Sequence, residues 1–291
     1  MMKMMTTLRP VNPYPALIIE SGKDKILVIS DLHIGWETSL SEKGVHIPSQ
    51  TNKILRRVEQ ILALEEPNHL IVLGDVKHTI VKIELGEWRD VPEFFEKLLK
   101  KIEHIKVVPG NHDGNIETLL PSRVEVTSQR GIILGEVGLF HGHAWPDIKM
   151  LGCKTLVIGH IHPVITFEDP MRFRITSQVW VKAPCNKLSL IKAALKRYKV
   201  KLKAEEDPEK VLKEDFGIKP KVEDLIIMPS FNDVLSGRAI NRALTLREDV
   251  FKDFIGPVLQ SGGAMLNKAE IYMLDGTFIG FLNDVIKLNK Q

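Results

Sequence analysis

The residues best suited to chemistry are 110–113, where an amide, an imidazole and a carboxylate follow a glycine in succession. A short apolar run at 105–109 precedes them and predicts a buried strand. Side chains such as Asn111, His112 and Asp113 are costly to bury, so a strand that ends in all three suits a cleft better than a core.

Four other apolar runs end in the same way. Strands predicted at 26–30, 70–73, 137–140 and 156–158 lead into these side chains, in chain order: Asp31 and His33, Asp75 and His78, His141 and His143, His160 and His162. The first strands alternate with helical patterns, which predicts a parallel, helix-covered sheet. Ligands of such sheets bind beyond the carboxyl ends of the strands, so we expect these side chains to meet there.

This combination of side chains indicates metal binding. A lone histidine is more often a core or surface residue, but independent scatter does not explain five strand ends of one construction. Oxygen and nitrogen ligands without a thiolate suit Mn²⁺, Fe²⁺ or Zn²⁺. Two Asp, one Asn and several His give about seven ligands, which are too many for one ion and suit two. A carboxylate can bridge two ions, so one Asp should be shared. Two ions about 3.5–4 Å apart are the arrangement that cleaves phosphoesters.

The remaining elements follow from periodicity and turn residues. A hairpin is expected at 16–30, followed by a helix at 49–64 that Ser49 caps, an irregular segment at 77–90 and a helix at 91–102. Strands then follow closely and predict a second, mixed or antiparallel sheet, from runs at 123–127, 131–134, 137–140, 155–158, 164–167, 173–181, 224–228, 269–274 and 277–282.

Composition sets broader limits. The chain has 291 residues, 44% hydrophobic and 26% charged, and a net charge of +3 that implies no partner by itself. Two cysteines make no disulfide framework and fit a cytoplasmic protein with isolated thiols, although one disulfide remains an alternative. The N-terminal residues lack a signal-peptide core, and no run is long enough to span a bilayer.

A basic stripe marks a change in composition. Residues 187–203 contain seven Lys or Arg and no acid, and apolar residues keep helical spacing through them. We interpret 186–221 as a charged insertion or surface excursion within a single domain that spans 1–291. Such a stripe is usually a solvated face; as the alternative, Lys192, Lys196, Arg197 and Lys199 contact phosphates of a nucleic acid.

The motifs together resemble a known family. Asp-x-His, Gly-Asp, Gly-Asn-His-Asp, His-Gly-His and Gly-His-x-His, in this order from Asp31 to His162, resemble the calcineurin-like metallophosphoesterases. Residues 180–182 and 228–232 look like the ICC-like branch, which is related to a bacterial ligase-associated DNA-repair phosphoesterase. The resemblance implies an α/β fold in which a two-sheet β-sandwich is flanked by helices.

The resemblance also implies roles. Asp31, His33 and His162 would hold one ion, Asn111, His141 and His160 the other, and Asp75 would bridge them. His112 would face the substrate and help the leaving oxygen, oriented by Asp113. His141 and His143 compete for one ligand position, and we favour His141 because it directly ends its strand. His78 stands where many relatives have Asp, so it is either a phosphate contact or a partner of the ligands.

We therefore expect a metal-dependent phosphoesterase that cleaves phosphodiester bonds of DNA or RNA with two divalent ions, Mn²⁺ before Fe²⁺ or Zn²⁺. The branch resemblance, the basic stripe and the tryptophans at 36, 88 and 145 favour nucleic acid, although loop tryptophans more often serve packing. The alternatives are a phosphodiesterase or phosphomonoesterase for small nucleotides and a non-catalytic scaffold. The scaffold is disfavoured because every ligand position is filled.

Overall fold

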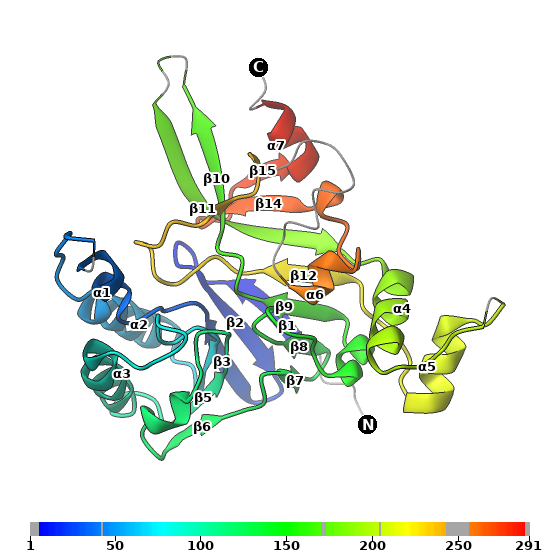
Figure 1. Cartoon of the computed structure of the whole chain (residues 1–291), viewed down its shortest axis with the longest axis horizontal. Coiled ribbons are helices and arrows are strands. Elements are labelled where there is room, and N and C mark those ends of the chain that lie inside the picture. The colour runs from blue at the N-terminus through cyan, green and yellow to red at the C-terminus, as the bar shows by residue number, and fades with distance from the viewer. Residues whose placement is uncertain are drawn as a thin grey trace.

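The structure is a computed structural model and describes residues 6–41, 43–169, 171, 173–203, 205–242 and 256–288. Two sheets pack against each other, and helices cover both outer faces (Figure 1). Strand β4 (His69–Leu73) shows why: Leu70 and Val72 face the helices, whereas Ile71 and Leu73 face the other sheet. Alternate residues of a strand point to opposite faces, so an unbroken apolar run fits a sheet that is buried on both sides. The expected helix-flanked, two-sheet α/β fold is confirmed.

The first sheet has six strands in the order β1-β2-β3-β4-β5-β6. Besides β4, they are β1 (Thr6–Pro10), β2 (Ala16–Ser21), β3 (Asp24–Ile29), β5 (His104–Val108) and β6 (Val124–Val126). The pairs β1–β2 and β2–β3 are antiparallel, and β3 to β6 run parallel. The carboxyl ends of β3, β4 and β5 therefore lie at one edge.

The second sheet has nine strands, seven of them in the order β13-β10-β11-β12-β9-β8-β7, with β14 on β11 and β15 on β14. They are β7 (Ile132–Leu134), β8 (Val137–Leu139), β9 (Thr155–Ile158), β10 (Pro163–Glu168), β11 (Arg174–Pro184), β12 (Asp224–Ile227), β13 (Arg238–Ala239), β14 (Glu270–Met273) and β15 (Phe278–Phe281). β8, β9 and β12 are parallel and β10, β11 and β12 antiparallel, so the sheet is mixed, as expected.

Helices α1 (Trp36–Ser41), α2 (Thr51–Glu65) and α3 (Leu85–Leu98) lie on the side of the first sheet (Figure 1). Helices α4 (Lys187–Arg197), α5 (Pro208–Phe216), α6 (Pro257–Gln260) and α7 (Leu282–Leu288) contribute to the core on the outer side of the second. The segment interpreted as an excursion contains α4 and α5, and α4 buries Leu190, Ile191, Ala194 and Leu195 in that core.

Three expectations about single elements were wrong. The run at 123–127 forms β6 of the first sheet and does not join the second. Helix α2 begins at Thr51, and its cap residue is Gln50 and not Ser49. The Ser49 hydroxyl still accepts from Thr51 N at 3.3 Å and donates to Asp90 at 2.8 Å. Helix α3 begins at Leu85, within the stretch expected to be irregular, and ends at Leu98.

The early start of α3 has a physical explanation. Its first turns expose Leu85 and Trp88 and bury the acids Glu87 and Asp90, which inverts the pattern that periodicity detects. Backbone N–H groups satisfy Glu87, which also forms a capping box with Glu84. A helix that buries acids at its N-terminus is favourable but has no hydrophobic signature.

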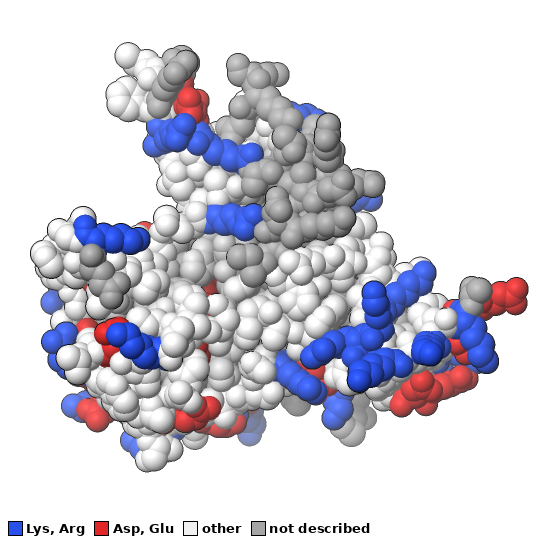
Figure 2. Space-filling model, viewed as in Figure 1, with Lys and Arg blue, Asp and Glu red and all other residues white. Residues whose placement is uncertain are grey.

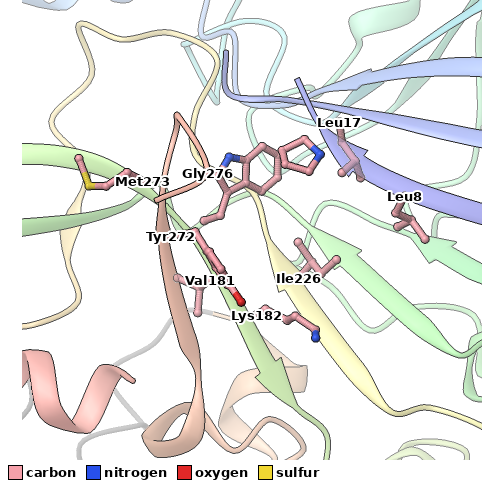
Figure 3. Close-up of a pocket in the computed structure, with 10 residues that line it drawn as sticks. Leu8, Leu17, Val181, Lys182, Ile226, Tyr272, Met273 and Gly276 are labelled. Atoms are coloured by element: carbon pink, nitrogen blue, oxygen red, sulfur yellow. The ribbon is translucent and has the colours of Figure 1, made fainter. Parts of the chain in front are cut away.

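A mostly apolar hollow of about 270 Å³ lies between the sheets. Leu8 and Leu17 of the first sheet face Ile226, Tyr272 and Lys182 of the second across it (Figure 3). None of the residues predicted to bind metal lines it, so it is separate from the chemistry of the strand ends.

Two predictions concern other properties of the chain. Cys153 and Cys185 are both free. Among the helices of the described ranges, none has the length and apolar character needed to cross a membrane.

Candidate metal centre

The five strand-end motifs meet in space. Contacts between histidines, and between histidines and aspartates, join the side chains that follow β3, β4, β5, β8 and β9, at distances of 2.9 to 3.9 Å. Two glycines of the motifs make this crowding possible. A Cβ atom at Gly110 would lie 2.1 Å from Oδ1 of Asp75, and one at Gly74 would lie 2.2 Å from Cδ2 of His141. The motif glycines therefore leave room for the neighbouring side chain.

The backbone at the site is unusual. Eight non-glycine residues in the described ranges have positive φ, and five of them are predicted metal ligands: Asp31, His33, Asp75, His160 and His162. Each such residue costs about 1–3 kcal/mol and persists only where its surroundings enforce it. Hydrogen bonds do so here; for example, His33 N donates to Asp75 O at 2.8 Å and His160 N to the Asp31 carboxylate at 3.1 Å.

Asp31, His33 and His162 form one group whose ligand atoms all lie within 4.8 Å of one another. Oδ1 of Asp31 lies 3.1 Å from Nε2 of His162, and the carboxylate is fully buried. Burial raises the pKa of Asp31, but His162 and His141 outweigh it and lower the pKa well below its usual value. The carboxylate is therefore charged and available to a cation.

Asp75, His141 and His160 form a second group within the same limit. Oδ2 of Asp75 lies 3.6 Å from Nε2 of His141, and the same oxygen lies 3.5 Å from Nε2 of His33 in the first group. Burial lowers the pKa of His141, but Asp75 and Asp31 outweigh it and raise the pKa to about 9. Because one oxygen of Asp75 lies near a histidine of each group, Asp75 connects the two groups.

The donor atoms fit metal ions. Three buried side-chain atoms at the site have no hydrogen-bond partner among the described residues: Nε2 of His33 and His160, and Oδ1 of Asn111. Buried polar atoms are normally paired, and unpaired ones that converge on one place are suited to an ion. Burial lowers the pKa of His160 to about 3, so its ring is neutral and keeps a lone pair for a metal.

His141 and His143, which compete for one predicted ligand position, differ in burial and in their neighbours. His141 is fully buried and belongs to the second group, whereas His143 is half-buried and lies outside both. Their Nδ1 atoms lie 3.1 Å apart. Burial, then the charge of His141, lowers the pKa of His143 to about 4, so its neutral ring can accept a hydrogen bond from His141. Ligating histidines usually have such a partner.

His112 lies at the rim, with 19% of its side chain exposed and Nε2 3.9 Å from Oδ2 of Asp75. Its expected orientation by Asp113 is wrong. The Asp113 carboxylate accepts hydrogen bonds from the backbone of Gly110 at 2.8 Å and Val76 at 2.9 Å, which ties two strand ends together. Nδ1 of His112 instead contacts the carbonyl oxygen of His78. A carbonyl only accepts, so Nδ1 carries the proton and Nε2 faces the site.

His78 belongs to a third group, with His33 and His112. Its Nδ1 lies 3.3 Å from Nδ1 of His33, and its ring is stacked on His112 with the centroids 5.7 Å apart. The fully buried Glu87 of α3 holds this loop by accepting from the backbone N–H groups of His78 and Thr79, at 2.9 and 2.7 Å. Sequence analysis missed Glu87. The available signal was its position three residues after Glu84, which is the spacing of a capping box.

Two more residues missed by the sequence analysis fix the first motif loop. The Ser230 hydroxyl donates to the carbonyl of Asp31 at 2.9 Å, and Nδ2 of Asn232 donates to that of Leu32 at 2.9 Å. Both side chains are buried. Both lie in 228–232, a segment that was noted in the sequence only for its family resemblance. The polar side chains of Ser230 and Asn232 were the signal that could have identified them.

The basic stripe lies outside the three groups of potential ligands. Lys192, Lys196, Arg197 and Lys199 are all exposed, on α4 and just after it. Arg197 lines a polar hollow with Ala144, the residue after His143. Of the four cations expected to contact substrate, Arg197 is thus the one that shares a hollow with the residue after the His-Gly-His motif.

The order of the motifs, their convergence and their unpaired donor atoms point to one family. The family model for calcineurin-like phosphoesterases matches residues 24–169, half of the chain. The chain belongs to the calcineurin-like phosphoesterase family. It is therefore a metal-dependent phosphoester hydrolase of a family that uses two metal ions, and it contains His and Asp clusters that could hold such ions.

Two solved structures are similar to this calcineurin-like phosphoesterase. The Pseudomonas putida nuclease MPE has 17% identity and a TM-score of 0.48, with 93% of this chain and 98% of that chain covered. The phosphoesterase YfcE from E. coli has 22% identity and a TM-score of 0.31, with 50% of this chain and 73% of that chain covered. Among curated proteins, none matches the chain.

Proposed function

We propose that this phosphoesterase is a nuclease-like enzyme that hydrolyses phosphodiester bonds of DNA or RNA, with Mn²⁺ as its metal. In this proposal Asp31, His33 and His162 hold one ion, and Asn111, His141 and His160 hold the other. Asp75 is shared between the ions. Fe²⁺ and Zn²⁺ suit the same nitrogen and oxygen ligands and are the alternatives that metal analysis would separate.

The position of Asp75 carries the proposal. One of its oxygens, Oδ2, lies 3.5 Å from a nitrogen of the first group and 3.6 Å from a nitrogen of the second. A carboxylate oxygen can contact two cations, whereas a neutral imidazole nitrogen has a single lone pair for one. The other oxygen accepts from His112 N at 2.9 Å, which keeps the carboxylate in place.

The chemistry divides between the ions and the chain. When bound, two divalent ions supply Lewis-acid stabilisation of the phosphoryl oxygens and an acidified water as the nucleophile. His112 supplies the proton for the leaving oxygen: its Nδ1 is occupied by the His78 carbonyl, which leaves Nε2 to donate when the ring is protonated. Nδ1 of His141 lies 3.1 Å from His143, which fixes the direction of the ring and leaves Nε2 for an ion.

Nucleic acid is proposed as the substrate because of the cations beside the centre. The exposed Arg197 and the lysines of α4 can attract a polyanion, whereas a small nucleotide needs no extended basic surface. A cytoplasmic location is proposed as well, since both cysteines are free.

A substrate panel tests the function. Single-stranded DNA, duplex DNA, RNA, cyclic nucleotides and a nitrophenyl phosphomonoester are each incubated with the protein and Mn²⁺. Turnover should be highest on a nucleic acid and absent with chelator. Preference for cyclic nucleotides or the monoester would instead identify a small-nucleotide enzyme, and no turnover of any substrate would identify a scaffold.

A further inference from the structure

A polar hollow of about 270 Å³ lies beside the metal centre. Its wall includes Ala144, which follows His143 directly, and His143 in turn lies 3.1 Å from His141. The rest of the wall comes from two distant segments, the turn before β7 and the end of α4. Three segments of the chain thus form a concave surface that begins one residue from the motif histidines.

The hollow has cations that are available for a ligand. Arg130 and Arg197 both line it, and both are exposed. Neither guanidinium has an ion-pair partner within the described ranges, in contrast to arginines elsewhere, such as Arg9 and Arg174. Figure 2 shows Lys and Arg side chains gathered over α4. Arg197 is the last residue of that helix. Guanidinium groups bind phosphate through paired hydrogen bonds, so two unpaired ones favour a phosphate ligand.

The hollow also has aromatic surfaces. Trp145 is half-buried, packs against the core of the second sheet and lines the hollow. Tyr198 is 38% exposed and is held by an edge contact with Phe216, with ring centroids 5.4 Å apart. Two supported rings next to unpaired arginines are the combination on which single-stranded nucleic acids stack their bases.

We infer that this hollow binds a nucleotide that flanks the scissile bond in a single-stranded nucleic acid. Its base stacks on Trp145, and its phosphate contacts Arg130 and Arg197. The volume is slightly below the range of pockets for drug-sized ligands, which suits one nucleotide. In a duplex, moreover, the bases are stacked on each other and closed to the rings. The inference rests on the proposed function and names its substrate class.

Two variants of the whole protein separate stacking from charge. Trp145→Leu removes the ring and keeps an apolar side chain, and its control is Trp88→Leu at the exposed tryptophan of α3. The double variant Arg130→Ala, Arg197→Ala removes the charge, and its control is Lys149→Ala, Lys213→Ala, which removes two exposed cations that do not line the hollow. Melting temperatures verify that all four proteins are folded.

Binding of a fluorescein-labelled oligodeoxythymidine is measured by anisotropy in chelator, and KM on the same oligomer is measured with Mn²⁺. Trp145→Leu should weaken both by about 5- to 50-fold and abolish the quenching of tryptophan fluorescence by the oligomer. The double arginine variant should reduce the slope of log affinity against log salt by about 0.7, the value for the one phosphate that the protein no longer neutralises. The controls should match the wild type.

Inorganic polyphosphate is the competing probe, since it has the charge and no bases. It should lose affinity in the arginine variant and keep it in Trp145→Leu. Oligomer binding that is unchanged in Trp145→Leu would reduce the hollow to a patch of positive charge and overturn the inference. So would an arginine variant that behaves like its lysine control.

Failure of this inference is distinguishable from failure of the proposed function. Turnover of bis(nitrophenyl) phosphate tests the metal centre without the hollow, and the variants should leave it unchanged. If the wild type hydrolyses this small diester while the variants match their controls on the oligomer, only the inference fails. If the wild type hydrolyses no diester at all, the proposed function fails whatever the binding data show.

Discussion

The metal centre and the polar hollow meet at His143 and Ala144 but are built on opposite principles. At the centre, Asp31 and His141 are fully buried, and hydrogen bonds hold the backbone in a left-handed conformation. In the hollow, Arg130 and Arg197 are exposed and unpaired within the described ranges. The difference suggests a division of labour: the buried centre determines which bond is broken, and the exposed hollow determines which molecule presents it.

The largest effect is expected from Asp75→Asn. A neutral amide bridges two cations poorly, so turnover on every substrate should fall by more than the roughly 10–100-fold that loss of a supporting partner costs. Elemental analysis should find fewer than two ions per chain. A variant with two ions and normal activity would contradict the shared role of Asp75. Asp24→Asn, at the other end of β3, is the matched control.

His112→Ala should separate the centre from the leaving group. General acid catalysis contributes about 10²–10⁴-fold, so loss on a nucleic-acid diester should be of that order. A nitrophenolate leaves without help, so loss on the nitrophenyl diester should be far smaller. Metal content should remain near that of the wild type. Equal losses on both substrates, or loss of metal, would mean that His112 is a ligand or a binding contact.

Asn232→Ala tests whether the centre depends on its distant support. The variant leaves the Leu32 carbonyl without its donor, so metal affinity should fall by about 10–100-fold in isothermal titration. Asn68→Ala is the control, since its side chain accepts from Lys25 N at the opposite end of β3. It should lower stability without changing metal affinity. A similar change of affinity in both variants would point to general loosening.

A pair of variants at His160 measures the backbone strain. The residue has φ of +69°, where any side chain with a Cβ costs about 1–2 kcal/mol relative to glycine. His160→Gly should therefore be more stable than His160→Ala by about 1 kcal/mol in denaturant titrations with chelator, although both lose the ligand. Equal stabilities would show that the backbone leaves this conformation once the imidazole is removed.

The smallest effect is expected at Glu65, whose ion pair belongs neither to the metal centre nor to the polar hollow. Arg9 bonds Glu65, and Lys25 lies 3.1 Å from it; the bond to Arg9 is the largest cause that lowers the pKa of Glu65 to about 2. A lowered pKa means that the stabilisation is complete above about pH 4.5 and is lost as pH falls toward 2. Glu65→Gln should cost about 1 kcal/mol at pH 7, since the half-exposed Arg9 is screened.

That cost should shrink as the solution is acidified, because the wild-type carboxylate then loses its charge too. Urea titrations of both proteins from pH 7 to about pH 2.5 measure it. A difference that stays constant over this range would mean that the glutamine changes packing and not charge.

Sequence was informative at the centre because the predicted ligands directly follow the strands. Each pair, such as Asp31 with His33, follows an apolar run, so pattern and chemistry lie within a few residues. Glu87 was missed because it is a buried acid in a helix that exposes Leu85. The orientation of His112 was missed because its partner is a backbone carbonyl, which every residue has. Contacts of this kind depend on the tertiary fold alone.

The polar hollow also could not be predicted from the sequence, because the tertiary fold alone brings its residues together. Three residues of its wall are far apart in the sequence: Arg130 precedes Trp145 by 15 positions, and Arg197 follows Trp145 by 52. The basic stripe predicted a surface, but charge spacing in sequence could not select Arg197 over Lys192. Only the packing of α4 beside the loop after β8 brings Arg197 and Trp145 into one wall.

The support of the first motif loop by Ser230 and Asn232 also has a consequence for the order of synthesis. These residues bind Asp31 and Leu32 across 199 and 200 positions of the chain. At about 5–20 residues per second, a ribosome needs roughly 10–40 s to make that stretch. The span matched by the family, 24–169, includes every proposed ligand but neither of these two supports. A nascent chain can therefore present the complete ligand set while its first loop still lacks these supports, so the centre becomes rigid only after translation has passed Asn232.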